Sequence, residues 1–474
     1  MAPRLPAPYL SVVASARNDD HGGNLLRRLQ IFVNALVGQA NRHSLPVELV
    51  LVEWNPPAEK PPLIEALRWP ADPGGFCAIR IVTVPAAVHR RYLHCEAQPL
   101  YQMIAKNAGI RRATGEFILA TNIDILLSDE LMRFLAERRL QPGRMYRTDR
   151  HDVTEDVPVD AGIEDQLAYC RGHRLRINAR EGTFSLTPEG YPVPRPADIV
   201  AGGNGIFFGR GWSAPEQRFG QLSRRVTGAA KILLRPFPEA RTLFLETDGP
   251  SEIRVWDVKL RAEGRSLVRI PVPANAPGLV VEGVFRGLRC GWDRAAINRP
   301  TVSKAPARLI PRAARILACA IAWVKSPGPI GSRWRRRVSA PLPAELHINA
   351  CGDFTLLHRS HWMELRGYPE FDSFSMNIDA VLCYMAHYGG AVEEVLPEPL
   401  CVYHIEHAAG SGWTPEGQKL LFDRLAAKGV PWLDWDQVLE WAADMERFRT
   451  TMVFNREGWG LETEDLPEAL PHPG

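Results

Sequence analysis

Apolar runs alternate with helix-like segments across residues 1–150, and this alternation constrains the fold more than any other feature of the sequence. The apolar runs lie at 9–16, 47–54, 78–85 and 116–126, and helical or turn-forming segments separate them. Strands that are apolar on both faces and alternate with helices form mostly parallel sheets that helices cover. The sequence therefore predicts a Rossmann-like α/β fold, in which ligands bind where the parallel strands end at their carboxyl side.

The composition is that of a globular protein of two or three domains. The chain has 474 residues, of which 45% are hydrophobic and 23% charged. The 57 basic and 54 acidic residues leave a net charge of +3, so we expect no nucleic-acid partner. The eight cysteines form no CxxC pair, which favours reduced thiols in a cytosolic compartment. The N-terminal residues do not resemble a secretory signal, and we expect a cytoplasmic location.

The pattern of residues divides the chain into five parts. Residues 1–211 and 344–412 have α/β character, whereas 212–298 contains short strand-like runs between Pro, Gly and Asp and reads as a β-sandwich-like module. Residues 299–343 form a basic helix or linker, and 413–474 form a helical extension. Because α/β character returns after the β-rich part, we expect that module to be inserted into one α/β domain.

The basic part has the pattern of a helix that lies on an anionic membrane surface. Residues 299–337 contain only basic charges, and Arg308, Arg312 and Arg315 fall on one helical face opposite an apolar one. No run in the sequence reaches the roughly 18 to 20 apolar residues that span a bilayer. We therefore expect peripheral attachment at the inner face of the cell membrane. A solvated basic helix or linker is the alternative.

The triplet Asn-Ile-Asp occurs twice, at 122–124 and at 377–379. Asp124 ends an apolar run, where a carboxylate can hold Mg²⁺ or Mn²⁺, although Asp at a strand end is also a common turn or cap residue. Ser128 is expected to cap the helix that follows.

The N-terminal residues resemble the nucleotide-sugar-binding half of GT-A type, family 2-like glycosyltransferases. "LSVVASARND" and "VELVLVEWN" match the family's first two strands, and "IAKNAGIRRATGEFILATNID" matches the run that ends in its metal-binding DxD motif. The similarity covers residues 1–150 in the same order and spacing, and "GWSAPE" resembles the start of β-sandwich modules within some bacterial glycosyltransferases. The resemblance implies a GT-A fold and hexosyl transfer from a nucleotide-diphosphate donor to a glycan or lipid-linked acceptor, as in the assembly of cell-surface polysaccharides.

The resemblance also implies site residues. Asp124 falls on the last Asp of DxD, and His404 or His407 would complete the shell of a divalent metal, Mn²⁺ or Mg²⁺. Hydrogen-bonded surface histidines are the alternative for that pair. The residues expected to contact the nucleotide-sugar are Ser15, Arg17, Asn18, Glu53, Trp54, Lys106, Asn107 and Asn122.

The second triplet falls on a different family position. Asp379 lies eleven residues before Gly390, where inverting members carry their general base, and "ACGDFTLLHRSHWMELRGYPEF" upstream resembles the acceptor-side segment. The resemblance implies that Asp379 deprotonates the acceptor hydroxyl, which then attacks from the face opposite the nucleotide. A helix N-cap is the alternative role for Asp379.

Three positions depart from the family pattern. Asn122 replaces the first Asp of DxD, and Ile378 replaces the Glu before Asp379. Trp54 replaces an acid that contacts the base in uridine-nucleotide users; it could stack on a base, which leaves the nucleotide open. Asn122 and Ile378 favour a second hypothesis, a catalytically silent GT-A-like protein that binds glycan or nucleotide within a membrane-associated assembly. A sugar nucleotidylyltransferase would need a glycine-rich loop with Arg and Lys after the first strand, and "ASARNDDHGGN" lacks it.

Tryptophans cluster in the C-terminal part, at Trp413, Trp432, Trp435 and Trp441. Core packing is the expected role, because three of the four fall at or just before helical spacing. A platform for sugar rings is the alternative.

Overall fold

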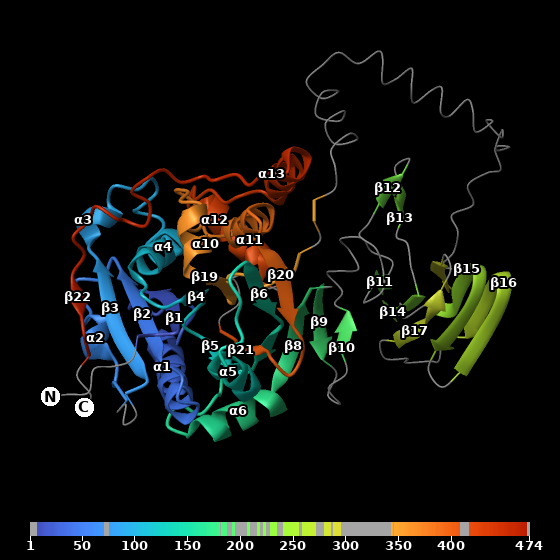
Figure 1. Ribbon diagram of the computed structural model, residues 1–474, viewed down its shortest axis with the longest axis horizontal. Coiled ribbons are helices and arrows are strands. Elements are labelled where there is room, and N and C mark those ends of the chain that lie inside the picture. Colours follow the sequence, from blue (N-terminus) through green and yellow to red (C-terminus); the bar gives the residue numbers. More distant parts are fainter. Residues whose placement is uncertain are drawn as a thin grey trace, which may run out of the picture.

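The structure is a computed structural model, and Figure 1 shows its architecture. It describes residues 7–70, 75–180, 343–344, 346–407 and 417–471, together with the strands β9 to β18 between 182 and 294. The predicted basic helix lies outside the described residues, so the expected membrane-surface contact stays a prediction. Within the described part of the chain, no helix is both long and apolar enough to cross a membrane.

A large, mostly parallel sheet forms the centre of the molecule and confirms the predicted α/β class (Figure 1). Its strand order is β20-β6-β19-β4-β1-β2-β3-β22, and β1 pairs in parallel with both β2 and β4. Its strands are β1 (Leu10–Ala16), β2 (Val47–Trp54), β3 (Cys77–Val84), β4 (Phe117–Ala120), β6 (Arg144–Thr148), β19 (Thr355–His358), β20 (Val392–Leu396) and β22 (Glu468–Ala469).

Helices cover both faces of this sheet because successive residues of the central strands point to opposite sides. Val13 and Val50 pack with α4, α10, α11 and α13, whereas Val12 and Leu49 pack with α1 and α5 on the other face. The helices are α1 (Leu25–Arg42), α2 (Leu63–Ala66), α3 (Ala86–His89), α4 (Gln102–Arg112), α5 (Asp129–Ala136), α6 (Ile163–Gly172), α10 (Arg359–Leu365), α11 (Ile378–Tyr388), α12 (Gln418–Ala427) and α13 (Trp435–Phe448).

The run 116–126, predicted as one strand, is divided in two. It forms β4 and then β5 (Ile125–Leu127), because β5 leaves the large sheet and pairs antiparallel with β21 (Val402–Ile405) in a second sheet. Residues 121–124 therefore connect two sheets. The second sheet has the order β10-β9-β8-β7-β21-β5, and its other strands are β7 (Arg150–Val153), β8 (Arg174–Ala179), β9 (Gly182–Leu186) and β10 (Pro192–Pro194).

The helix after β5 begins as predicted. The side-chain oxygen of Ser128 accepts a hydrogen bond from the backbone N–H of Leu131 at 3.2 Å, which caps the first turn of α5.

The β-rich part contains an antiparallel sheet of order β11-β14-β17-β15-β16, with β18 paired to β15, and a β12-β13 hairpin. The described residues from 206 to 294 are all in strands, but the predicted insertion and the five-part division stay predictions. The strands are β11 (Ile206–Phe208), β12 (Glu216–Arg218), β13 (Gln221–Ser223), β14 (Gly228–Leu234), β15 (Ala240–Val255), β16 (Val258–Pro271), β17 (Leu279–Phe285) and β18 (Leu288–Arg294).

The C-terminal segment after α13 packs against the N-terminal part of the chain. Figure 1 shows it crossing the molecule to reach β22, which pairs antiparallel with β3. On the way, Trp459 is buried and Arg112 donates hydrogen bonds to the carbonyl oxygens of Gly460, Leu461 and Glu464. This segment therefore covers the edge of the large sheet at β3.

Candidate functional site

A cavity of about 770 Å³ lies at the carboxyl ends of β1 and β4, the position that parallel sheets use for ligands. Three buried polar atoms that line one end of it have no hydrogen-bond partner among the described residues: Ser15 Oγ, Arg28 Nε and Asp124 Oδ1. Because buried polar groups are almost always hydrogen-bonded, these atoms point to a polar ligand at this end.

Asp124, His404 and His407 converge at the same end of the cavity. Asp124 Oδ2 lies 3.8 Å from His404 Nε2 and 3.4 Å from His407 Nε2, and one ligand atom from each residue lies within 4.8 Å of the others. His404 lies in strand β21, and His407 follows the end of that strand. Between them, the Ile405 N–H donates to the Asp124 carbonyl oxygen at 2.9 Å. One carboxylate and two imidazoles could hold a divalent metal ion.

The charges around Asp124 keep it ionised. Burial alone would raise the pKa of its carboxyl group, but His404, His407 and Arg28 hold that pKa well below its usual range. The Arg28 Nε lies 3.6 Å from Asp124 Oδ2, and Arg28 was not among the predicted site residues. Its guanidinium is anchored by the carbonyl oxygens of Gly23 and His21, so a fixed cation stands beside the candidate metal ligands.

Asp152 contacts the ring nitrogen of His404 that faces away from Asp124 and so orients the ring. It is fully buried in β7, and its Oδ1 lies 3.3 Å from His404 Nδ1, which leaves Nε2 directed at Asp124. Metal-ligating histidines usually have such a partner on their second nitrogen. Asp152, His404 and Glu406 form another group with metal-ligand distances, but Arg176 pairs with both carboxylates and Arg150 also pairs with Asp152, so cations already occupy these oxygens. The Asp124 group is therefore the better metal site.

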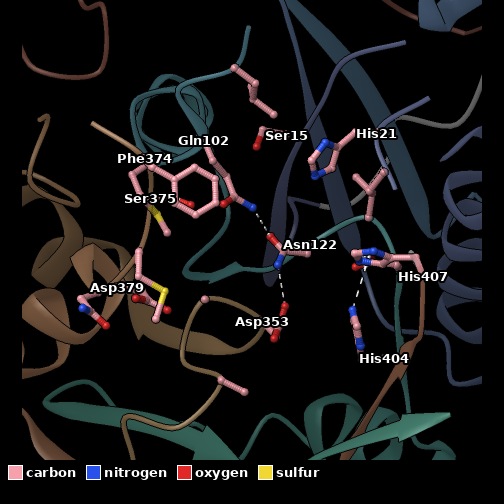
Figure 2. A pocket seen from close by; sticks show the side chains of 18 of the residues that line it. Ser15, His21, Gln102, Asn122, Asp353, Phe374, Ser375, Asp379, His404 and His407 are labelled. Carbon is pink, nitrogen blue, oxygen red and sulfur yellow. Dashed lines mark hydrogen bonds and ion pairs between the residues drawn. The ribbon is translucent and has the colours of Figure 1, made fainter. Parts of the chain in front are cut away.

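Asn122 lines the cavity, and both the oxygen and the nitrogen of its amide are hydrogen-bonded (Figure 2). Its carbonyl oxygen accepts from Gln102 Nε2 and Lys106 Nζ, each at 2.8 Å, and its NH₂ donates to Asp353. Metal coordination by this carbonyl would require the two donors to move. Asp353, which sequence reasoning missed, lines the cavity and also pairs with Arg150.

Lys106 does not line the cavity. Its ammonium is fully buried between Asn122 and the carbonyl oxygen of Gly352, at 2.8 Å from each oxygen, and burial lowers its pKa to about 8. The predicted contact of Lys106 with a nucleotide-sugar is therefore corrected: the residue fixes Asn122 and the loop at Gly352.

Asp379 lines the cavity on the side away from the histidines, as Figure 2 shows. It is the second residue of α11, whose N-cap is Asn377, so the N-cap alternative is wrong. Its Oδ1 accepts from the Ala380 N–H at 3.0 Å. Burial raises the pKa of this carboxyl group, while the Cys351 thiol and Lys106 lower it. A Cβ at Gly352 would lie 2.9 Å from Asp379 Oδ2, so glycine leaves room for the carboxylate.

Three arginines line the cavity near the unpartnered polar atoms, and each faces an aspartate that also lines it. Arg17 pairs with Asp19, Arg28 with Asp124 and Arg150 with Asp353. No protein-family model matches this chain, and no curated protein matches it either. The chemistry of the cavity is therefore the basis for inferring a function.

Two predicted residues line the cavity beside the candidate metal ligands. Ser15 is the penultimate residue of β1, and its hydroxyl has no partner among the described residues. Arg17 donates to the carbonyl oxygen of Asn55 at 2.7 Å and pairs with Asp19 at 2.8 Å. Both therefore lie in the cavity, and their contact with a nucleotide-sugar stays a prediction.

Three other predicted residues are buried in polar contacts and do not line the cavity. Asn18 donates to the Pro61 carbonyl oxygen, and Glu53 accepts from the backbone N–H of Leu63, each at 2.9 Å. Asn107 accepts from the backbone N–H of Tyr368 at 2.8 Å. Their predicted direct contacts with a nucleotide-sugar are corrected, because their polar groups shape the loops instead.

Trp54 is also placed away from the cavity. Its ring is fully buried, and its Nε1 donates to His89 Nδ1 at 2.9 Å. Strand alternation directs Trp54 into the core that contains Val52 and Val84. The expectation that Trp54 stacks on a base is therefore wrong.

Replacing Trp54 with Phe is expected to lower the free energy of unfolding by about 2–3 kcal/mol, because the buried His89 Nδ1 loses its donor and the smaller ring leaves space. Urea unfolding measures this loss. Ligand affinity at the cavity should not change. A variant that keeps full stability but binds nucleotide more weakly would contradict the core role and indicate that Trp54 contacts the ligand.

Proposed function

We propose that this protein is a GT-A type glycosyltransferase that moves a sugar from a nucleotide-diphosphate donor to a glycan or lipid-linked acceptor, with inversion and with the help of a divalent metal. The observation that carries the proposal is the position of Asp379 at one side of a single cavity and of Asp124, His404 and His407 at the other. The cavity has the size of a small-molecule site and lies at the carboxyl edge of the parallel strands.

Asp124, His404 and His407 would hold the metal. Asp124 Oδ1 is buried without a partner, which fits an oxygen that a cation would take. Two imidazoles among three ligands favour Mn²⁺ over Mg²⁺, because Mg²⁺ prefers oxygen ligands. When bound, the metal supplies positive charge to the departing diphosphate. Arg28 adds a fixed cation 3.6 Å from the same carboxylate and would share that task.

Asp379 would act as the general base. It would accept the proton of the acceptor hydroxyl while the oxygen attacks the anomeric carbon on the face opposite the diphosphate. Two features favour this role: the carboxylate lines the cavity, and within the described part of the chain only a hydrogen bond from the Ala380 N–H and a thiol contact from Cys351 occupy it. The bond to the sugar breaks as the new glycosidic bond forms, and the nucleotide diphosphate leaves.

Titration calorimetry with UDP-, GDP- and dTDP-sugars, with and without Mn²⁺, tests the donor site. We expect one nucleotide class to bind in a metal-dependent manner, and Asp124→Ala to weaken that binding at least about 10- to 100-fold. The matched control is Asp160→Ala, which removes a carboxylate whose side chain is 73% exposed on the surface. Failure of every nucleotide class to bind the wild type would overturn the proposal.

A catalytically silent binding protein is the second candidate. The engaged amide of Asn122 favours it, because a neutral and occupied group stands where the resemblance places an acid. Metal-dependent nucleotide binding without release of nucleotide diphosphate over a panel of acceptors would support this candidate.

A further inference from the structure

The side of the cavity beyond Asp379 has an aromatic wall that the donor site does not use. Trp435, the first residue of α13, lines the cavity and is 38% exposed, and Phe374 lines it nearby. By contrast, Trp441 packs between Phe371 and Phe454 in the core. An exposed aromatic face inside a cavity that also contains polar groups is a surface on which sugar rings pack. Core packing is therefore confirmed for Trp441, the sugar platform stays a prediction, and Trp413 lies outside the described residues.

Backbone contacts hold this wall beside the proposed base. The N–H of Phe374 donates to the Pro431 carbonyl oxygen at 2.8 Å, and the side-chain amide of Asn377 donates to the Leu433 carbonyl oxygen at 2.9 Å. These bonds fix the segment that leads into Trp435 against the segment that leads into Asp379. A sugar on the Trp435 ring therefore lies in the part of the cavity that contains the base.

The same wall is positively charged. Arg424 and Lys428 lie one helical turn apart along α12 and its C-cap, and both line the cavity. Lys428 is exposed and forms no ion pair within the part of the chain that the structure describes. The acidic residues that line the cavity belong to other segments than α12 and α13; they are Asp19, Asp124, Asp353, Asp379 and Glu406.

We propose that this wall is an acceptor subsite for an acidic saccharide, in which Trp435 packs against a sugar ring and Lys428 with Arg424 binds a carboxylate or phosphate on that sugar. The proposal rests on the proposed function, because it assigns the opposite end of the cavity to the donor diphosphate. A neutral acceptor would leave the exposed Lys428 without a charged partner among the described residues, whereas an acidic one matches both the ring face and the charge.

The test compares three probes on the full chain: methyl glucuronide, a glucose phosphate and neutral methyl glucoside. Ligand-observed NMR gives their affinities, and the indole N–H signal assigned with Trp435→Phe reports the place of binding. We expect the acidic probes to bind about two- to fivefold more tightly than the neutral one and to shift the Trp435 signal. The stronger of the two acidic probes identifies carboxylate or phosphate as the preferred group.

Single variants separate the ring contact from the charge contact. Lys428→Ala should remove most of the preference for acidic probes and keep the shift of the Trp435 signal, while Trp435→Ala should weaken all three probes. The control is Lys419→Ala, on the same helix but 85% exposed and outside the cavity lining, which should change nothing. Equal binding of acidic and neutral probes, no binding of any probe, or a preference that survives loss of both Lys428 and Arg424 would overturn the inference.

The donor titration keeps this failure distinct from failure of the proposed function. Nucleotide binding without a preference for acidic sugars would overturn the subsite alone. If the protein binds no nucleotide but binds acidic sugars in a charge-dependent manner, the proposed transferase function is wrong and the proposed saccharide site is supported.

Discussion

Asp379→Asn is expected to lower the rate of sugar transfer about 10²- to 10⁴-fold while donor affinity stays at the wild-type value. Asparagine has the same shape and can still accept the hydrogen bond from the Ala380 N–H, but it cannot take the proton of an acceptor hydroxyl. Release of nucleotide diphosphate, measured with the donor found by titration and with an acceptor, gives the rate. The matched control is Asp444→Asn, an exposed carboxylate on α13.

The pH dependence gives a second test of the same residue. Burial raises the pKa of Asp379, and the base must be ionised to act, so the rate should rise with pH through a value above the usual range of an aspartate. Lys106 lowers that pKa, and Lys106→Met should therefore move the rise to higher pH. A wild-type rate in Asp379→Asn, or a loss of rate explained entirely by weaker donor binding, would contradict the assignment.

The sheet could be predicted from the sequence because its signal is local. Each residue of β1 and β2 is buried, and such runs between helices have few other folds available. The division of the run 116–126 could not be predicted, because β5 is drawn into the second sheet by β21, which lies far along the chain. No residue pattern between 116 and 126 indicates that β21 will pair with β5.

The candidate site shows the same limit. Asp124, His404 and His407 were predicted through the family resemblance, but Asp152 and Asp353 were missed. The contacts of Asp152 with His404 and of Asp353 with Asn122 join segments that are remote in sequence. A lone Asp within a short strand gives no local sign of such partners.

The error at Trp54 has a different cause. Glu53 and Trp54 are neighbours in β2, so their side chains point to opposite faces of the sheet. Trp54 belongs to the core beneath α4, which includes Ala105 and Ala108. Strand alternation therefore predicts the position of the Trp54 side chain better than the match to the family position does.

Asp152→Ala is expected to lower the free energy of unfolding by about 3–5 kcal/mol, because it removes the shared partner of a buried charge cluster. Arg150 Nε lies 2.8 Å from Asp152 Oδ1, Arg176 pairs with Oδ2, and the carboxylate is fully buried. Arg150 keeps Asp353 as a partner and Arg176 keeps Glu406, which favours the lower end of that range. Urea unfolding measures the change.

The same substitution also separates stability from metal binding. His404 Nδ1 loses the carboxylate 3.3 Å away, so the ring is no longer held with Nε2 toward Asp124, and Mn²⁺ affinity should fall about 10- to 100-fold. Asp152→Asn keeps the volume and should lose less stability than Asp152→Ala. The exposed control Asp160→Ala should stay within about 0.5 kcal/mol of the wild type. If Asp152→Ala loses stability but a folded sample still binds Mn²⁺ with wild-type affinity, Asp152 supports the fold alone and the orientation of His404 depends on other contacts.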